Sequence, residues 1–497
     1  MKHSLIRSTR AFTLDKAELA LVAASEGSLS LVDQIFTLVT DAIKQQRIAK
    51  GMRMPSVRQL AENCGISRDT AARAYDKLVA HGLLESRRGS GFYVRSRTVR
   101  QPQERTDAYP GRLNTDEKLV WMRFRLMLLK PLPALKSYSG IGYLPDTWMD
   151  ETSIEGELRT VARGNQRVLG QVGDPQGFLP LRNQLQLKLH DMGIYVEPAN
   201  IILTSGAADA LNLIIQVYLN TPGECVLVEQ PCQPLLVQRL MANGLEMLCV
   251  PRSTDGPDLE TLRELCEKHR PRFFFCSSVL HNPTGNHLTP PIAFQLLQLA
   301  EEFDLTIIED DTYGDLLPQG LTSAPTRLAP LDQLRRVIYI GSFSKTLAPG
   351  LRVGYLAANT SHIEWLTMNR ALYCIASNSL AERTVYRLLT QGNYRHHCEQ
   401  IRMRLSSLRP LAAEALQALD VHIDYEPDAG FYLWGNLGDG INAFELAQKM
   451  LQQGHLVAPG GMFSLIHPSY MRVNVAEVLN NGLLPVLAQQ LSVLRGR

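Results

Sequence analysis

Hydrophobic positions in the first hundred residues follow a helical period and then a strand period. Apolar side chains recur every three or four residues early on, at Leu31, Ile35, Phe36, Val39 and Ile43. This spacing puts them on one face and predicts a helix over 31–47. Ser56 and Ser67 are suitable N-caps for two further helices, which we expect to end near residues 63 and 80.

The pattern changes after Gly82. The runs LLESR and GFYVR flank the tight link RGSG, and Leu84, Phe92 and Val94 can face one side of a β-hairpin. Three helices followed by a β-hairpin describe a winged helix.

A polar stretch separates this domain from the rest of the chain. Residues 96–114 contain two prolines and a glycine, which is typical of a linker, and an apolar helix is expected near 119–129. We therefore divide the chain into an N-terminal extension at 1–27, the winged helix at 28–96, a linker and docking helix at 97–135, and a large domain at 136–497.

The large domain alternates strands with helices. The expected strands are NIILTS, ECVLVE, RFFFCSS, LTIIED and VIYIGS. Such alternation predicts an α/β fold, a mostly parallel sheet covered by helices. From about residue 370, helices mix with short strands such as GFYLWG and MRVNVA, which indicates a smaller α+β lobe.

Charge is unevenly distributed along the chain. Residues 1–100 hold 17 Lys and Arg against 9 Asp and Glu, whereas the remainder holds 34 against 40. A basic front ahead of a slightly acidic body suits contact with a polyanion, although a solvated surface gives the same count.

The eight cysteines are scattered, without a CxxC pair or metal-ligand spacing, so we expect reduced thiols and no metal site. The basic N-terminus is followed by Asp15, Lys16 and Glu18 and not by the apolar region of a signal peptide. No apolar run approaches the roughly 18 residues of a membrane span. These features predict a cytoplasmic protein without a membrane partner.

The third predicted helix has the place of a recognition helix, which enters the major groove of DNA and favours phosphate at its N-terminus. Arg68 and Thr70 stand at its start, where they can reach base edges or phosphates. Each arginine taken alone could be an ordinary surface charge. The expected contacts to double-stranded DNA are Arg53, Ser56, Arg58, Ser67, Arg68, Thr70, Arg73, Arg87, Arg88, Gly89 and Gly91.

The strongest motif of the large domain is GSFSKTLAPGLRVGY. Lys345 stands among small hydroxyl and glycine residues after a strand, where a lysine can form a Schiff base with a carbonyl cofactor. Ser342, Ser344 and Arg352 can surround a phosphate with donors and positive charge. A lone S-x-S-K sequence is more often a surface loop than a site, so the other motifs decide whether Lys345 marks a cofactor site.

The segment TSGAADAL follows a strand and opens a helix. The backbone N–H groups of Gly206, Ala207 and Ala208 could therefore bind a phosphate, although a glycine loop without a ligand looks the same. Far along the chain, Arg472 could clamp a carboxylate with two hydrogen bonds.

Two motifs supply groups for an aromatic ring. In HNPTG, the Asn282 amide could donate to a phenolic oxygen, and in EDDTYG the Tyr313 hydroxyl could contact the same oxygen. A buried Asp310 carboxylate opposite a pyridine nitrogen would keep that nitrogen protonated, so that the ring acts as an electron sink.

The first domain resembles a known family. The segment PSVRQLAENCGISRDTAARAYDKLVAHGLLESRRGSGFYV is similar to the GntR-type winged helix over about residues 28–96, with P-S-x-R-x-L-A, G-x-S-R and G-S-G in order.

The cofactor motifs, with GDPQGFLPLR, GFYLW and APGGMF, resemble aspartate-aminotransferase-like enzymes, fold type I of the pyridoxal-phosphate proteins, over about 140–490. The resemblance implies that Lys345 carries pyridoxal 5'-phosphate as an internal aldimine and that Asp310 pairs with its pyridine nitrogen. The other implied contacts are the ring oxygen with Asn282 and Tyr313, the phosphate with Arg352, and an amino acid carboxylate with Arg472.

A GntR-type winged helix ahead of such a domain resembles the MocR subfamily of transcriptional regulators. The resemblance implies a DNA-binding homodimer that senses a small amine or amino acid effector as an aldimine. In fold type I, residues of both subunits usually complete each site.

Two positions depart from the family pattern. Val172 stands where a tyrosine usually reaches the partner's phosphate, and Gln233 stands where an aromatic ring usually stacks on the cofactor. Each loss removes a contact of about 1 kcal/mol, which favours a sensor over an efficient transaminase.

Two other functions stay open. Asp310, Lys345 and Arg472 also suit a working aminotransferase with an accessory DNA-binding domain. Alternatively, the large domain only dimerises a DNA-binding protein, which would then be colourless.

Overall fold

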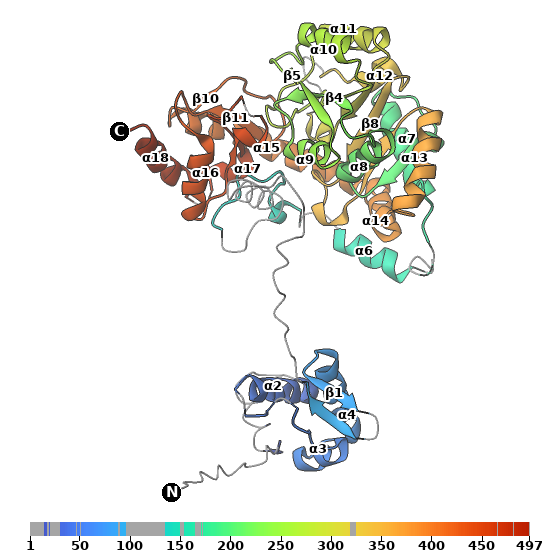
Figure 1. Ribbon diagram of the computed structural model, residues 1–497, viewed down its shortest axis with the longest axis vertical. Helices are drawn as coiled ribbons and strands as arrows, with labels where there is room; N and C mark the ends of the chain where they lie inside the picture. The colour runs from blue at the N-terminus through green and yellow to red at the C-terminus, as the bar shows by residue number, and fades with distance from the viewer. Residues whose placement is uncertain are drawn as a thin grey trace. The chain divides into compact units, whose positions relative to one another are not determined.

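The chain divides into two units, Met1–Arg112 and Leu113–Arg497, shown as a computed structural model in Figure 1. The structure describes residues 14–16, 19, 30–45, 47–49, 51–87, 90–95, 135–149, 154–164, 170, 172–318, 325–464, 466–480 and 482–496. The predicted linker at 96–114, the predicted helix at 119–129, and Arg88 and Gly89 lie outside these residues.

In the described part of the first unit, three helices precede a two-stranded antiparallel sheet, as the hydrophobic pattern predicts. The elements are α2 (Leu31–Lys44), α3 (Val57–Cys64), α4 (Arg68–Ala80), β1 (Leu84–Arg87) and β2 (Gly91–Val94).

Local side-chain chemistry fixes where these helices begin and end. Ser56 and Gln59 form a reciprocal capping box at α3, and the Ser67 hydroxyl accepts the Thr70 N–H at 3.0 Å to cap α4. Gly65 ends α3 at a φ of 67°, a conformation that glycine adopts without steric cost.

The core of the first unit lies between the helices and the hairpin. Ile35, Leu60 and Tyr75 are fully buried, and the Tyr75 hydroxyl donates to the Pro55 carbonyl at 2.8 Å. Burial of the apolar face of each helix stabilises the unit, and the arginines of α4 remain outside this core.

The second unit contains a seven-stranded sheet in the order β3-β9-β8-β7-β6-β4-β5. Its strands are β3 (Ile201–Thr204), β4 (Cys225–Gln230), β5 (Glu246–Pro251), β6 (Phe273–Cys276), β7 (Thr306–Asp310), β8 (Val337–Ser342) and β9 (Gly354–Ala357). β9 alone runs opposite to the other six strands, so the prediction of a mostly parallel sheet is confirmed.

Helices cover both faces of this sheet (Figure 1). One face packs against α8 (Ala207–Tyr218), α9 (Pro234–Ala242) and α13 (Thr360–Tyr373). The helices that contribute to the core on the other face are α7 (Leu179–Asp191), α10 (Leu259–His269), α11 (Pro290–Glu302), α12 (Leu328–Asp332) and α14 (Ser379–Thr390). Because strand residues alternate between the two faces, each strand needs an almost continuous apolar run.

A smaller lobe, red in Figure 1, follows the large sheet. Its four-stranded antiparallel sheet has the order β10 (His422–Ile423), β11 (Tyr432–Asn436), β13 (Tyr470–Asn474) and β12 (Ala458–Pro459). The helices of this part are α15 (Asn393–Gln417), α16 (Ala443–Gln452), α17 (Val475–Val478) and α18 (Leu483–Leu494). The expected smaller α+β lobe is therefore present, but it begins with α15 and not near residue 370, because α14 packs on the large sheet.

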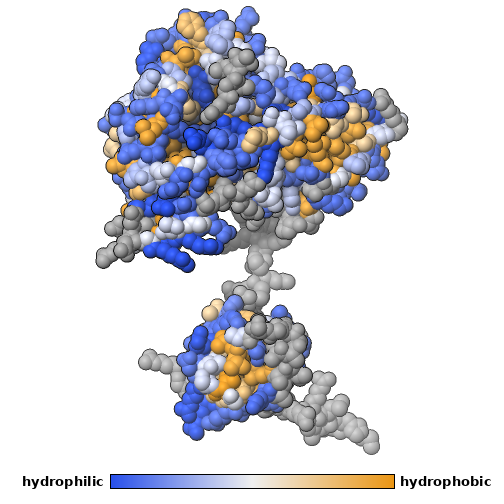
Figure 2. Space-filling model, turned by 180° about the vertical axis from the view of Figure 1, so that it is seen from behind, coloured by the Kyte–Doolittle hydropathy of each residue, from blue (hydrophilic) through white to orange (hydrophobic). Residues whose placement is uncertain are grey.

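Short helices complete the second unit. They are η1 (Asp146–Trp148), α6 (Ile154–Arg163), η3 (Pro198–Asn200), η4 (Gly314–Leu316), η5 (Pro349–Leu351) and η6 (Gly460–Met462). Among the described helices, none combines the length and apolar character that a membrane crossing needs. Figure 2 shows a mainly polar face on which apolar side chains gather in separate patches.

The segment before η1 is attached to the smaller lobe by backbone hydrogen bonds. Lys136 N–H donates to the Gly454 carbonyl and Gly140 N–H to the Leu456 carbonyl, both at 2.7 Å. These bonds hold residues 136–142 against the smaller lobe and fix the position of the Gly142 carbonyl.

Candidate cofactor and ligand site

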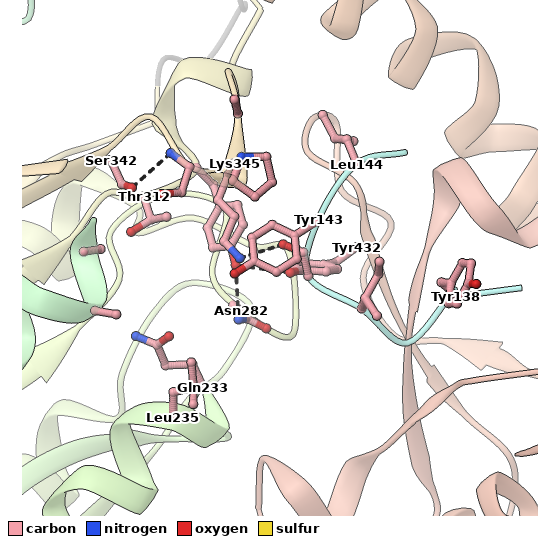
Figure 3. A pocket seen from close by; sticks show the side chains of 18 of the residues that line it. Tyr138, Tyr143, Leu144, Gln233, Leu235, Asn282, Thr312, Ser342, Lys345 and Tyr432 are labelled. Carbon is pink, nitrogen blue, oxygen red and sulfur yellow. Dashed lines mark hydrogen bonds between the residues drawn. The ribbon is translucent and has the colours of Figure 1, made fainter. Parts of the chain in front are cut away.

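A cavity of about 1380 Å³ in the second unit collects most of the residues that the motifs single out. Its wall includes Ala207, Ala208, Asn282, Asp310, Tyr313, Ser342, Ser344, Lys345, Arg352 and Arg472. They come from the ends of the large sheet, from the start of α8 and from β13 of the smaller lobe, and Figure 3 shows several of them converging. Chain segments far apart in sequence thus form one site.

Lys345 follows β8 and reaches into this cavity. Its Nζ donates to the Gly142 carbonyl at 2.6 Å and lies 3.8 Å from the centre of the Tyr143 ring. Burial lowers the pKa of Lys345 to about 7, and the positive charges of Arg472 and Arg352 contribute, whereas Asp310 opposes them. A substantial fraction of this side chain is therefore a neutral, nucleophilic amine near pH 7.

Asp310 ends β7, and both of its carboxylate oxygens are hydrogen-bonded. Oδ1 accepts from the Thr312 N–H at 3.0 Å and from the Thr312 hydroxyl, and Oδ2 accepts from the Gln233 amide at 2.8 Å. Burial raises the pKa of Asp310, and the Thr312 hydrogen bonds act against that rise. Gln233, from which we expect only a lost ring contact, therefore also orients this carboxylate.

Asn282 links the ring-contacting residues to Arg472. Its amide nitrogen donates to the Tyr313 hydroxyl at 3.3 Å, which lies 3.1 Å from the Tyr432 hydroxyl. Its amide oxygen accepts from Arg472 Nη1 at 2.7 Å. One side chain thus couples the expected ring contact to the expected carboxylate contact.

Arg472 is only 4% exposed and is held between aromatic rings. Its guanidinium lies 4.1 Å from the centre of the Tyr432 ring and 4.8 Å from that of Phe463, and Nη2 donates to the Gly140 carbonyl at 2.7 Å. Its buried Nε has no hydrogen-bond partner among the described residues. A buried donor of this kind suits an entering carboxylate.

The groups expected to bind phosphate form a cradle at the start of α8. Arg352 donates to the Ser205 carbonyl at 2.9 Å and to the Ser344 hydroxyl at 3.2 Å. Gly206 has a φ of 84°, and a Cβ there would lie 2.6 Å from Arg352 Nη2. Only glycine therefore permits this close approach of the guanidinium to the helix N-terminus, which itself favours anions.

These donors fit pyridoxal phosphate. The cradle offers a cation, hydroxyls and helix N–H groups to a phosphate, Asp310 offers a carboxylate to a ring nitrogen, and Lys345 offers an amine to an aldehyde.

Several residues of the site carry no motif that the sequence reveals. Tyr143 and the Gly142 carbonyl lie in a stretch to which we assign no function beforehand, and Arg239 of α9 lines the cavity unannounced. Tyr432 belongs to the segment GFYLW, which resembles the family, but the resemblance assigns no role to this tyrosine.

The expected DNA contacts lie on the first unit, with different surroundings. Arg68 and Arg73 of α4 are exposed, as is Arg53 before α3. Two others are engaged locally, because Arg58 pairs with Glu62 at 2.9 Å and Arg87 with Glu85 at 2.6 Å. Ser56 and Ser67 serve as helix caps, and Thr70 shares a 2.8 Å hydrogen bond with Ser67.

The fold and the site define a fold type I pyridoxal-phosphate domain joined to a winged helix-turn-helix. Residues 144–489 match the family described as aminotransferase class I and II, and residues 31–94 match the bacterial regulatory proteins of the gntR family. The chain therefore belongs to the class I and II aminotransferase family and carries a GntR-family DNA-binding domain, the arrangement of MocR-type transcriptional regulators. Its cofactor is pyridoxal 5'-phosphate.

Some known proteins similar to this chain are aminotransferases, and others are transcriptional regulators. A 2-aminoadipate transaminase of Thermus thermophilus is 32% identical over 350 residues, covering 68% of this chain and 84% of that protein. The HTH-type transcriptional regulator TauR of Rhodobacter capsulatus is 28% identical over 450 residues, covering 88% and 91%. The crystal structure of LysN, an alpha-aminoadipate aminotransferase of Thermus thermophilus with a phosphopyridoxyl-leucine ligand, has a TM-score of 0.67 and 28% identity, covering 75% of this chain and 95% of that one.

Proposed function

We propose that this regulator holds pyridoxal phosphate through Lys345 and changes its DNA binding when a small amine or amino acid reacts at the same site. The observation that carries this proposal is the placement of Lys345 in one cavity with Arg472 and the phosphate cradle. The lowered pKa of this lysine, about 7, suits the same role. A carbonyl cofactor, its anion and a ligand carboxylate would all find complementary groups there.

The chain's own residues divide the work of binding. Pyridoxal phosphate supplies an aldehyde that condenses with primary amines, and a ring that withdraws electrons. Arg352 and Ser344 would hold its phosphate, Asp310 its ring nitrogen, and Asn282 with Tyr313 its ring oxygen.

An entering carboxylate would compete for Arg472 with two existing acceptors. These are the Asn282 amide oxygen and the Gly140 carbonyl, each 2.7 Å from a guanidinium nitrogen. Because Gly140 is also hydrogen-bonded to the smaller lobe, a ligand at Arg472 would affect both the lobe and Asn282. A ligand shifts a conformational equilibrium only through different affinities for its states, and this contact offers such a difference.

A visible spectrum of the purified protein tests cofactor, lysine and ligand together. We expect a yellow protein whose absorbance changes on titration with an effective amino acid, and whose Lys345→Ala variant loses the bound chromophore. Borohydride reduction followed by peptide mass spectrometry should place the adduct on Lys345. A cofactor-replete protein without an adduct at that position would refute the proposal.

Aminotransferase activity is a second candidate, favoured by the intact set of Asp310, Lys345 and Arg472 around the cavity. Gln233 argues against efficient turnover, because an amide replaces the stacking ring. Steady-state transamination assays beside a DNA-shift assay separate the two, since robust turnover without specific DNA binding would favour the enzyme.

We also propose a homodimer of the large unit. Exposed apolar side chains gather on and just after α13, where Trp365, Met368, Leu372, Tyr373 and Ile375 are each at least half exposed. Trp365, Met368 and Leu372 recur at the spacing of one helical face, and an exposed apolar face of this kind favours burial against another chain. Light scattering of the full chain and of Leu372→Glu tests this, with the variant expected to shift towards monomer.

A further inference from the structure

Arg239 is a basic residue of the cavity that none of the motifs announces. It lies near the end of α9, is half buried, and lines the same cavity as Ser344, Arg352 and Ala207. Its helix packs against α8, whose first turn forms one side of the phosphate cradle.

The charge of Arg239 is poorly compensated within the protein. Its side chain makes a hydrogen bond of 3.4 Å to the Leu235 carbonyl, close to the limit for such a bond. Among the described residues, no Asp or Glu forms a salt bridge with it, although the negative charge of Asp209 acts on it. A partly buried guanidinium with so little compensation suits an anionic ligand.

Because α9 packs against α8 and Arg239 lines the same cavity as Ala207, the guanidinium lies near the start of α8, where two charged residues act on it. Burial lowers the pKa of Arg239, the positive charge of Arg352 lowers it further, and Asp209 raises it. Asp209 stands in the first turn of α8, where its carboxylate accepts the Ser205 N–H at 2.9 Å. Arg352 contacts the Ser205 carbonyl on the same loop.

Two guanidinium groups near one helix N-terminus repel each other unless an anion lies between them. A phosphate dianion would relieve this repulsion and would satisfy donors on both side chains. Val172, where the family usually offers a tyrosine hydroxyl to the phosphate, has no side-chain donor and is 77% exposed. The cradle therefore lacks one expected contact and has an additional cation close by.

We propose that Arg239 is a second guanidinium contact for the phosphate of the cofactor, beside Arg352. This inference rests on the proposed attachment of pyridoxal phosphate in this cavity, and it assigns to α9 a part in holding the cofactor. The inference requires that Arg239 contacts the phosphate of the cofactor and not its pyridine ring.

Pyridoxal and pyridoxal phosphate separate these two roles, because both carry the aldehyde and ring while only one carries the anion. Apo full-length protein is titrated with each compound, and binding is followed by visible absorbance. Arg239→Met removes the charge at similar length, Arg239→Lys keeps it, and Arg159→Met removes an exposed charge of α6 outside the cavity.

We expect Arg239→Met to weaken pyridoxal phosphate binding about 10-fold or more, the effect of one charge-assisted contact. Pyridoxal binding should equal that of the wild type, Arg239→Lys should recover most of the affinity, and Arg159→Met should bind both compounds normally. Circular dichroism verifies that each variant is folded.

Other results would overturn the inference. Equal weakening of both compounds would show a structural role for Arg239, and unchanged binding of both would show no role in holding the cofactor. If Arg239→Met weakens only the binding of an amino dicarboxylate added after the cofactor, Arg239 contacts that ligand and not the phosphate. If the wild type itself takes up no pyridoxal phosphate, the proposed function fails; if it does so and Arg239→Met matches it, only this inference fails.

Discussion

At the scale of single residues, the protonation of Lys345 determines how fast the cofactor attaches. The side chain reacts as a neutral amine, which predominates above its pKa of about 7 and is lost as the pH falls below it. Attachment of pyridoxal phosphate to the apo protein should therefore accelerate as the pH rises through about 7. Stopped-flow absorbance across this range measures the midpoint.

Arg472 is the largest charged contributor to this low pKa, after burial itself. Arg472→Met should therefore raise the pKa of Lys345 and move the midpoint of the attachment rate to higher pH. Arg159→Met, on the exposed surface of α6, is the charge-matched control and should leave the midpoint in place. A midpoint that stays or falls in Arg472→Met would contradict the electrostatic account.

The sequence predicts some of these residues and not others, for a physical reason. Lys345, Asp310 and Asn282 sit in short motifs, where local spacing places the first two at or just after the end of a strand and Asn282 on a turn. The hydrogen bond from Gln233 to Asp310 and the contact of Tyr143 with Lys345 join segments far apart in the chain, so no local pattern encodes them.

At the scale of elements, the start of α8 is the part of the cradle that tolerates change least. In Gly206→Ala, the new Cβ would meet Arg352 at 2.6 Å, and alanine would be strained at a φ of 84°. We expect a stability loss of about 1–2 kcal/mol from the backbone strain and a further loss of cofactor affinity from the displaced guanidinium.

Gly223 provides a matched control for this substitution. Its φ of 85° is almost the same, but a Cβ there has nothing within 4 Å. Thermal unfolding and cofactor titration of both variants separate strain from displacement. Similar cofactor affinity in the two would show that the cradle does not depend on the glycine.

The N-cap of α4 should matter for the DNA-binding unit. Ser67→Ala removes the hydroxyl that accepts the Thr70 N–H and should lower the local stability of the helix by about 1 kcal/mol. Hydrogen exchange of α4 amides in the full chain measures this loss. Ser67→Asn, which can still cap, should exchange at close to the wild-type rate, and faster exchange in both variants would argue against the capping role.

Strand prediction succeeded where the apolar run was long and buried on both faces, as in β8. The pattern does not single out β5, which lies at the edge of the sheet and alternates between exposed and buried residues, or β9, whose four residues begin inside the GSFSKTLAPGLRVGY motif. The antiparallel pairing of β9 depends on tertiary contacts that periodicity does not encode.

At the scale of the whole molecule, the basic character is concentrated in the front of the chain, where exposed arginines on α4 are available to phosphates. Binding of a protein to duplex DNA weakens with salt in proportion to the phosphates it neutralises. Arg68→Ala should therefore reduce the slope of log affinity against log salt by about 1.

Arg159→Ala, in the other unit, is the control for this prediction and should leave the slope unchanged. Fluorescence anisotropy with operator-length DNA at several salt concentrations supplies both slopes. An unaltered slope in Arg68→Ala would exclude a phosphate contact at that position.

The hydrogen bond between Lys345 and the Gly142 carbonyl links the reactive side chain to the backbone of a distant segment. Any covalent bond made at Nζ repositions or removes the donor on which that carbonyl depends. The peptide group must then find another partner, and it lies in the segment that backbone hydrogen bonds attach to the smaller lobe. A reaction at the Lys345 amine can therefore shift the backbone at Gly142.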